Sequence, residues 1–148
     1  MPILNYTTQV NTDRTVEEIR KKLVAAGAQA VLMEYGDHEL IAAISFRIKT
    51  PDGELSFRMP ANPDGVLRAM HKSRKVPGRL LTTAQATRVS WRIIKDWVEA
   101  QLAMVESGNA EITQVFLSYW QSPQTGRTLY EAMKDDGFKL LTQGGSQA

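Results

Sequence analysis

The sequence predicts an α+β fold in which an antiparallel sheet of about four strands is covered by a C-terminal helical part. Segments with alternating apolar residues lie before residue 60, and segments with helical periodicity follow them, apart from one early helix. Turn-forming sequences join the later strand segments, which favours antiparallel pairing. The longest helical stretch, residues 82–108, carries two of the three tryptophans and is expected to form one long central helix.

The N-terminal half predicts the order β-α-β-β-β. Residues 3–10 are rich in Ile, Tyr, Thr and Val, so we expect a first strand there. Thr15 and Glu18 form a capping box that would begin a short helix, and Gly27 would end it. The first strand could pair with the third or the fourth. The three later strands, joined as a meander by polar turns, are expected at residues 30–35, 40–50 and 55–59.

Four helices are expected after the sheet. In the first, Asn62 is a good N-cap and Pro63 suits the first helical position. The central helix is expected to begin with a capping box, in which Thr82 accepts from the Gln85 amide and the Gln85 side chain reaches back to the Thr82 amide. The last two helices would begin at Asn109 and Thr128, and an anchor packing back on the body is expected from Phe138, Leu140 and Leu141.

Two adjoining apolar lines run along the central helix, so we expect it to be packed on at least two sides. Its polar residues form a narrow exposed stripe. Trp91 and Trp97 are six residues apart and therefore lie on different sides of the helix. Both are expected in the core; the alternative is that one of them is a partner contact or a stacking platform.

The length of 148 residues fits a single domain, expected over residues 1–141 and followed by a disordered tail at residues 142–148. The absence of Cys excludes a disulfide framework, a thiolate metal site and a thiol nucleophile. No signal-peptide pattern is present, and no apolar run approaches the roughly 20 residues of a membrane span. We therefore expect a soluble, cytoplasmic protein that does not contact membranes.

The net charge of +2 hides an uneven distribution. Residues 1–65 hold seven bases and nine acids, and residues 96–148 hold three bases and seven acids. Between them, residues 66–95 hold eight bases and no acid. Such an asymmetry indicates an anionic partner more directly than the total charge does. The eight bases are Arg68, Lys72, Arg74, Lys75, Arg79, Arg88, Arg92 and Lys95.

Six of these cations are the candidate nucleic-acid-binding residues. Three lie in the loop before the central helix, and three recur at steps of four and three along its exposed stripe. Free backbone amides at residues 83–85 could donate to the same anion. The alternative is a solvated basic face in which the helix cations pair with Asp96, Glu99 or the acidic flanks. The six candidates are Arg74, Lys75, Arg79, Arg88, Arg92 and Lys95.

An aromatic cluster after the central helix is the candidate partner interface. It consists of Phe116, Tyr119 and Trp120. These side chains either pack against the central helix or form a surface for self-association or for a host protein, because aromatic residues dominate interface energetics. The sequence therefore leaves open a homodimer or a protein-binding inhibitor or modulator of a host or defence protein.

Catalysis is not expected. The two histidines, His38 and His71, have no sequence neighbours that would form a metal pair or a triad. No glycine motif for cradling phosphates is present. The prediction is a non-enzymatic protein with no catalytic residues, no cofactor and no metal.

Five stretches of the chain carry a family resemblance: NYTTQV, TPDGELSFRMPANPDGV, RVSWRIIKDWVEAQLAMVE, QVFLSYW and TLYEAM. They resemble small proteins of tailed phages, prophages and related mobile elements, a family of unknown function. The resemblance covers most of residues 3–133, is most specific in the central helix and implies a cytoplasmic protein of an infected or lysogenic cell. It implies an early, replication or recombination gene neighbourhood, but no activity and no site residues.

Overall fold

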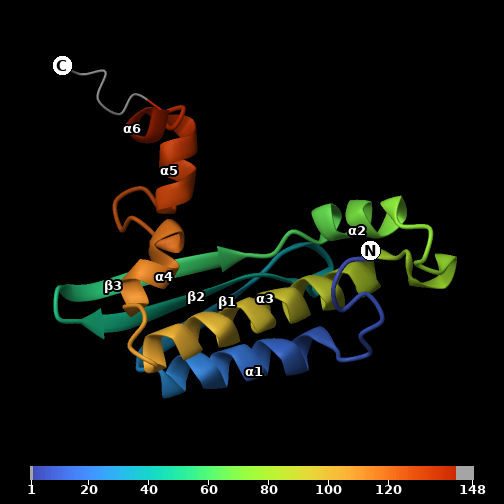
Figure 1. The fold of residues 1–148 in the computed structure, drawn as a ribbon, viewed down its shortest axis with the longest axis horizontal. Coiled ribbons are helices and arrows are strands. Elements are labelled where there is room, and N and C mark those ends of the chain that lie inside the picture. The colour runs from blue at the N-terminus through green and yellow to red at the C-terminus, as the bar shows by residue number, and fades with distance from the viewer. Residues whose placement is uncertain (1, 143–148) are drawn as a thin grey trace.

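The computed structural model describes residues 2–142, which form a three-stranded antiparallel sheet and six α-helices (Figure 1). The α+β class, the antiparallel sheet and the long central helix are therefore confirmed. The predicted tail lies outside the described residues except for Thr142, and the single domain over residues 1–141 stays a prediction. The strands are β1 (Ala28–Tyr35), β2 (Ile41–Thr50) and β3 (Gly53–Pro60), and the helices are α1 (Thr12–Ala25), α2 (Pro63–Lys72), α3 (Thr83–Glu106), α4 (Ile112–Phe116), α5 (Leu129–Asp135) and α6 (Lys139–Thr142).

Helices α1 and α3 lie side by side over one face of the sheet, in which β2 is the central strand (Figure 1). Alternation along β2 turns Ile44, Phe46 and Ile48 toward these helices. Phe46 stacks on Phe57 of β3 with ring centroids 5.2 Å apart, and Phe116 meets Phe46 edge-on at 5.1 Å. With α2 also packed against it, α3 is covered on more than two sides, as the sequence predicted.

The two tryptophans of α3 have different environments. Trp91 is fully buried, and its indole Nε1 donates to the Ile41 carbonyl at 3.1 Å. Trp97 is partly buried and meets the rings of Phe116 and Tyr119 edge-on, with centroid distances of 5.5 and 5.6 Å. Trp91 is therefore a core residue, whereas Trp97 lies at the edge of the core and is partly exposed.

The predicted first strand is wrong. Residues 3–10 form turns and irregular backbone, in which Asn5 has a φ of 65° and its carbonyl accepts from the Thr8 amide at 3.0 Å. The physical reason is a competing partner on α3. The buried Gln85 side chain donates through Nε2 to the carbonyls of Tyr6 and Thr8, both at 2.9 Å. One side chain thus binds the carbonyls that a neighbouring strand would otherwise bind, and the sheet has three strands rather than four.

Two predicted helix starts also differ from the structure. Helix α1 begins earlier than expected, because Asn11 is its N-cap and Thr15 is buried inside the helix. Helix α4 is capped by Glu111 rather than by Asn109. In both cases two residues with suitable side chains lie within one turn of each other, and burial or backbone geometry selects between them. Three predicted N-caps are confirmed, at Asn62, Thr82 and Thr128.

An ion pair crosses the sheet face that is turned away from α1 and α3. The Arg58 guanidinium donates to both carboxylate oxygens of Glu34, at 2.9 and 3.0 Å. Arg58 holds the pKa of the Glu34 carboxyl below its ordinary value of 4.5, although partial burial acts in the opposite direction. A carboxyl whose pKa is lower in the folded state stabilises the fold above its unfolded pKa, and this contribution is lost as the pH falls through the folded value.

The Glu34→Gln variant is expected to be less stable than the wild type at neutral pH by up to about 1 kcal/mol, because the pair is partly exposed and screened by solvent. Denaturation in urea at several pH values would measure the difference in free energy of unfolding. The difference should shrink as the pH is lowered below 4.5, since protonation of Glu34 removes the same charge. A difference that stays constant over this range would contradict the role of the pair.

A second, smaller apolar cluster forms the end of the molecule where α2 meets the start of α3. Its buried members come from α2, from the following loop and from α3, namely Met70, Val76, Ala86 and Val89. Ile3 and Tyr6 of the N-terminal segment pack against the same cluster. The cluster joins the N-terminal segment to the contiguous stretch of α2, loop and α3, and it positions the basic loop between the two helices.

Candidate nucleic-acid interface

The loop between α2 and α3 is held by hydrogen bonds between residues close in the sequence and by one buried side chain, Val76, which is 6% exposed. The Ser73 hydroxyl accepts from the Lys75 amide at 3.3 Å, and the Ser73 carbonyl accepts from the Val76 amide at 3.4 Å. Because Val76 turns inward, its neighbours Arg74 and Lys75 lie exposed on the surface. Arg79, further along the loop, is exposed as well.

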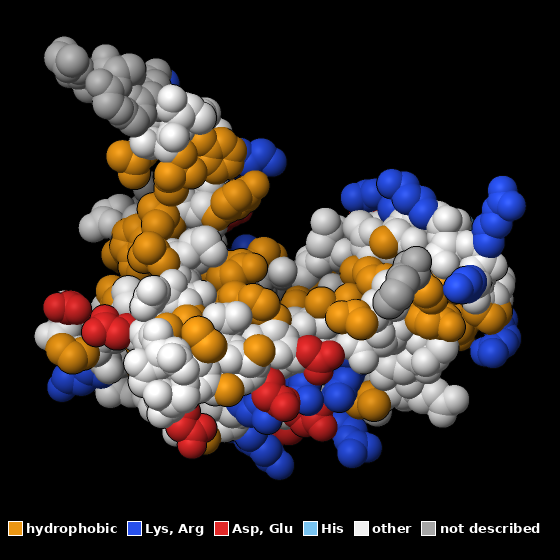
Figure 2. Space-filling model, in the orientation of Figure 1, with side chains coloured by type: hydrophobic (Ala, Val, Ile, Leu, Met, Phe, Trp, Pro, Cys, Tyr) orange, Lys and Arg blue, Asp and Glu red, His pale blue; other side chains and the backbone are white. Residues whose placement is uncertain are grey.

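Cations line a shallow hollow at the C-terminal end of α2, which we call the α2 hollow. It has a volume of about 350 Å³ and is lined by Ala69, Lys72, Ser73, Arg74 and Lys75. The negative end of the helix dipole stabilises Lys72 in the last turn. Figure 2 shows Lys and Arg side chains gathered at this end of the molecule. The α2 hollow therefore offers three cations at one surface.

A second hollow, which we call the α3 hollow, lies between the start of α3 and the N-terminal segment. It has a volume of about 370 Å³, and Arg79 and Arg88 both line it. Arg88 Nε donates to Gln85 Oε1 at 2.9 Å, and Gln85 is in turn bonded to the N-terminal segment. Gln85 thus orients Arg88 instead of completing the predicted capping box. The other residues that line the α3 hollow are Thr7, Thr8, Gln9, Asn11, Leu80 and Gln85.

The start of α3 supplies fewer donors than predicted. The Gln85 amide donates to the Thr82 hydroxyl at 3.1 Å, so it is not available to an anion. The Thr83 and Ala84 amides have no hydrogen-bond partner among residues 2–142. They lie at the positive end of the helix dipole, on the chain segment that follows Arg79. The two amides add to the positive potential near the α3 hollow.

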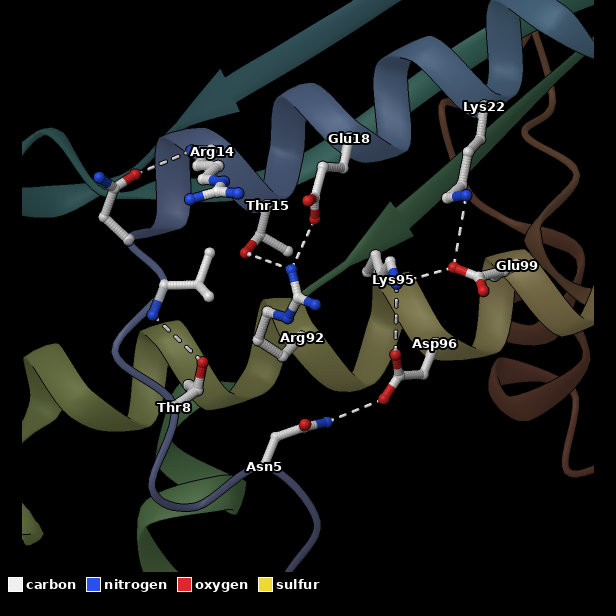
Figure 3. Close-up of polar contacts among 12 residues, drawn as sticks. Asn5, Thr8, Arg14, Thr15, Glu18, Lys22, Arg92, Lys95, Asp96 and Glu99 are labelled. Carbon is white, nitrogen blue, oxygen red and sulfur yellow. Dashed lines mark hydrogen bonds and ion pairs between the residues drawn. The ribbon is translucent and has the colours of Figure 1, made fainter.

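Two of the six predicted cations do not belong to this surface. Arg92 Nη1 forms an ion pair with Glu18 of α1 and lies 3.5 Å from the Thr15 hydroxyl (Figure 3). Lys95 Nζ lies 2.7 Å from Glu99, and its side chain is only 15% exposed. At Arg92 and Lys95, the stripe expected to be exposed on α3 is partly covered by α1. Arg92 therefore joins α3 to α1, and Lys95 pairs with acids of its own helix, which is the alternative that the sequence left open.

A second group of polar contacts in the seam between α1 and α3 centres on Glu99 and Lys95 (Figure 3). Glu99 accepts from Lys95 of its own helix and pairs with Lys22 of α1 at 3.3 Å. Both ammonium groups hold the pKa of the Glu99 carboxyl below its ordinary value, with Lys95 the larger cause. Asn5 of the N-terminal segment donates to Asp96 at 2.9 Å. These contacts assign the middle of α3 to packing rather than to ligand binding.

Five cations line the α2 and α3 hollows, and Arg68 is a further exposed cation of α2. We call these six residues the basic end: Arg68, Lys72, Arg74, Lys75, Arg79 and Arg88. Within residues 2–142, none of the six is in an ion pair, whereas eight of the other twelve Lys and Arg residues are. Arg68 and Lys72 were absent from the predicted set, although the acid-free run of residues 66–95 contains both.

The predicted aromatic interface is only partly accessible. Phe116 has no exposed surface, because its ring packs against Phe46 and Trp97 in the core. It cannot contact a partner in this conformation. Tyr119 and Trp120 are half-buried, and Tyr119 lines a hollow of about 240 Å³ beside Trp97. The surface available to a partner is therefore this hollow rather than the whole aromatic cluster.

Comparisons of the chain with protein-family models, with curated proteins and with solved structures found no match. Among residues 2–142, no group of three or more Asp, Glu or His side chains is placed to hold a metal ion. No helix in that part of the chain is long and apolar enough to cross a membrane.

Proposed function

We propose that the chain is a non-enzymatic accessory protein that binds the phosphate backbone of nucleic acid through the basic end. The observation that carries this proposal is the contrast in ion pairing: the basic end has no acidic partners among the described residues, although most other cations do. Clustered cations repel one another, so their accumulation does not stabilise the fold. A polyanion supplies the missing counter-charges.

The chemistry of the basic end favours contact with phosphates over recognition of bases. Its cations come from a helix end, a loop and the first turns of α3, and no recognised element for reading a groove is present in the sequence. We therefore propose little sequence specificity. The resemblance to proteins of phages and mobile elements implies that this binding takes place in the cytoplasm of an infected or lysogenic cell.

A salt titration tests the proposal. Binding of the full chain to labelled single-stranded and double-stranded DNA and RNA would be followed by fluorescence anisotropy. With about five phosphate contacts, the affinity should fall on the order of 10²–10³-fold between about 50 and 200 mM salt. Undetectable binding to every nucleic acid at about 50 mM salt would refute the proposal.

A protein-binding modulator of a host or defence protein is the second candidate function. The apolar hollow beside Tyr119 favours it, because half-buried aromatic side chains in a hollow are typical anchors of interfaces. The basic end would then face an acidic partner surface. A pull-down from nuclease-treated host lysate distinguishes the candidates: partners retained after nuclease treatment favour this function, and loss of all partners favours nucleic-acid binding.

A further inference from the structure

Helices α5 and α6 form an arm, residues 129–142, that extends away from the sheet and from α1 and α3 (Figure 1). The main contact of α5 with another element is with the 3₁₀ turn Leu117–Tyr119 at its foot. The arm is nevertheless ordered locally, because Thr128 caps α5 and the ring of Tyr130 meets that of Phe138 at 5.7 Å. It is a folded element with few contacts to the body.

The arm exposes apolar side chains that the sequence predicted to be packed. Leu140 and Leu141 are 78% and 68% exposed, and Tyr130 is 51% exposed. The expected anchor of Phe138, Leu140 and Leu141 on the body is therefore wrong: both leucines are exposed, and the Phe138 ring packs on Tyr130 within the arm. The Leu129 amide donates to the Trp120 carbonyl at 2.7 Å and holds the foot of the arm in this direction. Among residues 2–142, no apolar surface covers the tip of the arm.

The body carries an apolar hollow that no side chain of the described residues fills. The hollow of about 240 Å³ beside Tyr119 adjoins a larger one of about 730 Å³ at the foot of the arm, and Pro60 and Tyr119 line both. Figure 2 shows that the apolar side chains of the arm and those of the hollowed region below it lie on the same face of the molecule. The smaller hollow is lined by Met59, Pro60, Ile93, Ile94, Trp97 and Tyr119.

We propose that two copies of the chain form a dimer in which the arm of each copy packs into the apolar hollow of the other. A two-fold interface requires one surface to carry both the projecting part and its receptor, and this face carries both. The rim of the larger hollow holds both signs of charge, including the Arg127–Asp135 pair, so identical copies do not repel there. The proposal does not depend on nucleic-acid binding, because the basic end lies elsewhere on the molecule (Figure 2).

The first test is the solution mass of the full chain, measured by sedimentation from about 1 to about 100 μM. A reversible dimer is expected. The double variant Leu140→Asp/Leu141→Asp should weaken it at least about tenfold, because these side chains would be anchors. Leu4→Asp is the matched control, since Leu4 is also 69% exposed but lies in the N-terminal segment. A monomer at the highest concentration, or a dimer that the arm variant leaves unchanged, would overturn the proposal.

The second test locates the contact by cross-linking. The chain has no cysteine, so single-cysteine variants give a clean background. Leu140→Cys mixed with Pro60→Cys should yield a disulfide-linked heterodimer under oxidation. Leu32→Cys tests the rival dimer through the exposed edge of β1, in which two copies of this residue would meet. Efficient cross-linking through Leu32→Cys, with none between Leu140→Cys and Pro60→Cys, would show that the arm does not pack into the hollow of the other copy.

Discussion

Replacing Trp91 with alanine is expected to lower the free energy of unfolding by about 3–5 kcal/mol. Trp91 is fully buried and heads the large side chains of the core in volume. It lies where α3 packs on β2, so truncation would leave a cavity at the contact between the helix layer and the sheet. The Ile41 carbonyl would also lose its indole donor. The loss would be a large fraction of the stability of a domain of this size.

Urea denaturation followed by circular dichroism would measure this loss, because removing a tryptophan changes the fluorescence signal itself. Trp91→Phe is the informative comparison: it retains most of the apolar volume and removes the indole N–H, so we expect a cost of about 1–3 kcal/mol. Trp91→Ala should therefore lower the free energy of unfolding more than Trp91→Phe does. A cost below about 1 kcal/mol for alanine would show that the site relaxes or that Trp91 is not part of a close-packed core.

The elements that sequence periodicity predicted correctly are those whose local signals agree with burial. In β2, Ile44, Phe46 and Ile48 alternate in the sequence, and all three face the helices. At the start of α2, Asn62 and Pro63 meet the requirements of an N-terminus without competition from a neighbour. In such segments the short-range pattern and the tertiary contacts favour the same structure, so the pattern was sufficient.

The elements that were predicted incorrectly depend on contacts between distant residues. Gln85 suits a capping box locally, but its side-chain amide donates to carbonyls 77 and 79 residues away. That contact also explains why residues 3–10, which have high strand propensity, do not form a strand. Likewise, Arg92 pairs with Glu18, 74 residues earlier, and not with Asp96, four residues later in its own helix. The lack of acidic partners for the loop cations, in contrast, could be predicted, because their loop is exposed and no acid lies near them in the sequence.

The double variant Arg74→Glu/Arg79→Glu is expected to weaken nucleic-acid binding at least about 50-fold at low salt. It removes one cation from each hollow and places a carboxylate at each position. Two lost phosphate contacts should also reduce the slope of log affinity against log salt by about 2. Both residues are exposed, so the free energy of unfolding should stay within about 0.5 kcal/mol of the wild type. The change in slope distinguishes lost contacts from lost folding.

The control must change the net charge equally without touching the basic end. Lys21→Glu/Lys49→Glu does so, because both lysines are exposed, lack ion pairs within residues 2–142 and lie on α1 and β2. Reversing the charge of Arg92 would be uninformative, since the new carboxylate would face Glu18 and weaken the contact between α1 and α3. If the control pair lowers affinity and slope as much as the Arg74/Arg79 pair, binding depends on total charge. In that case the basic end is not a site.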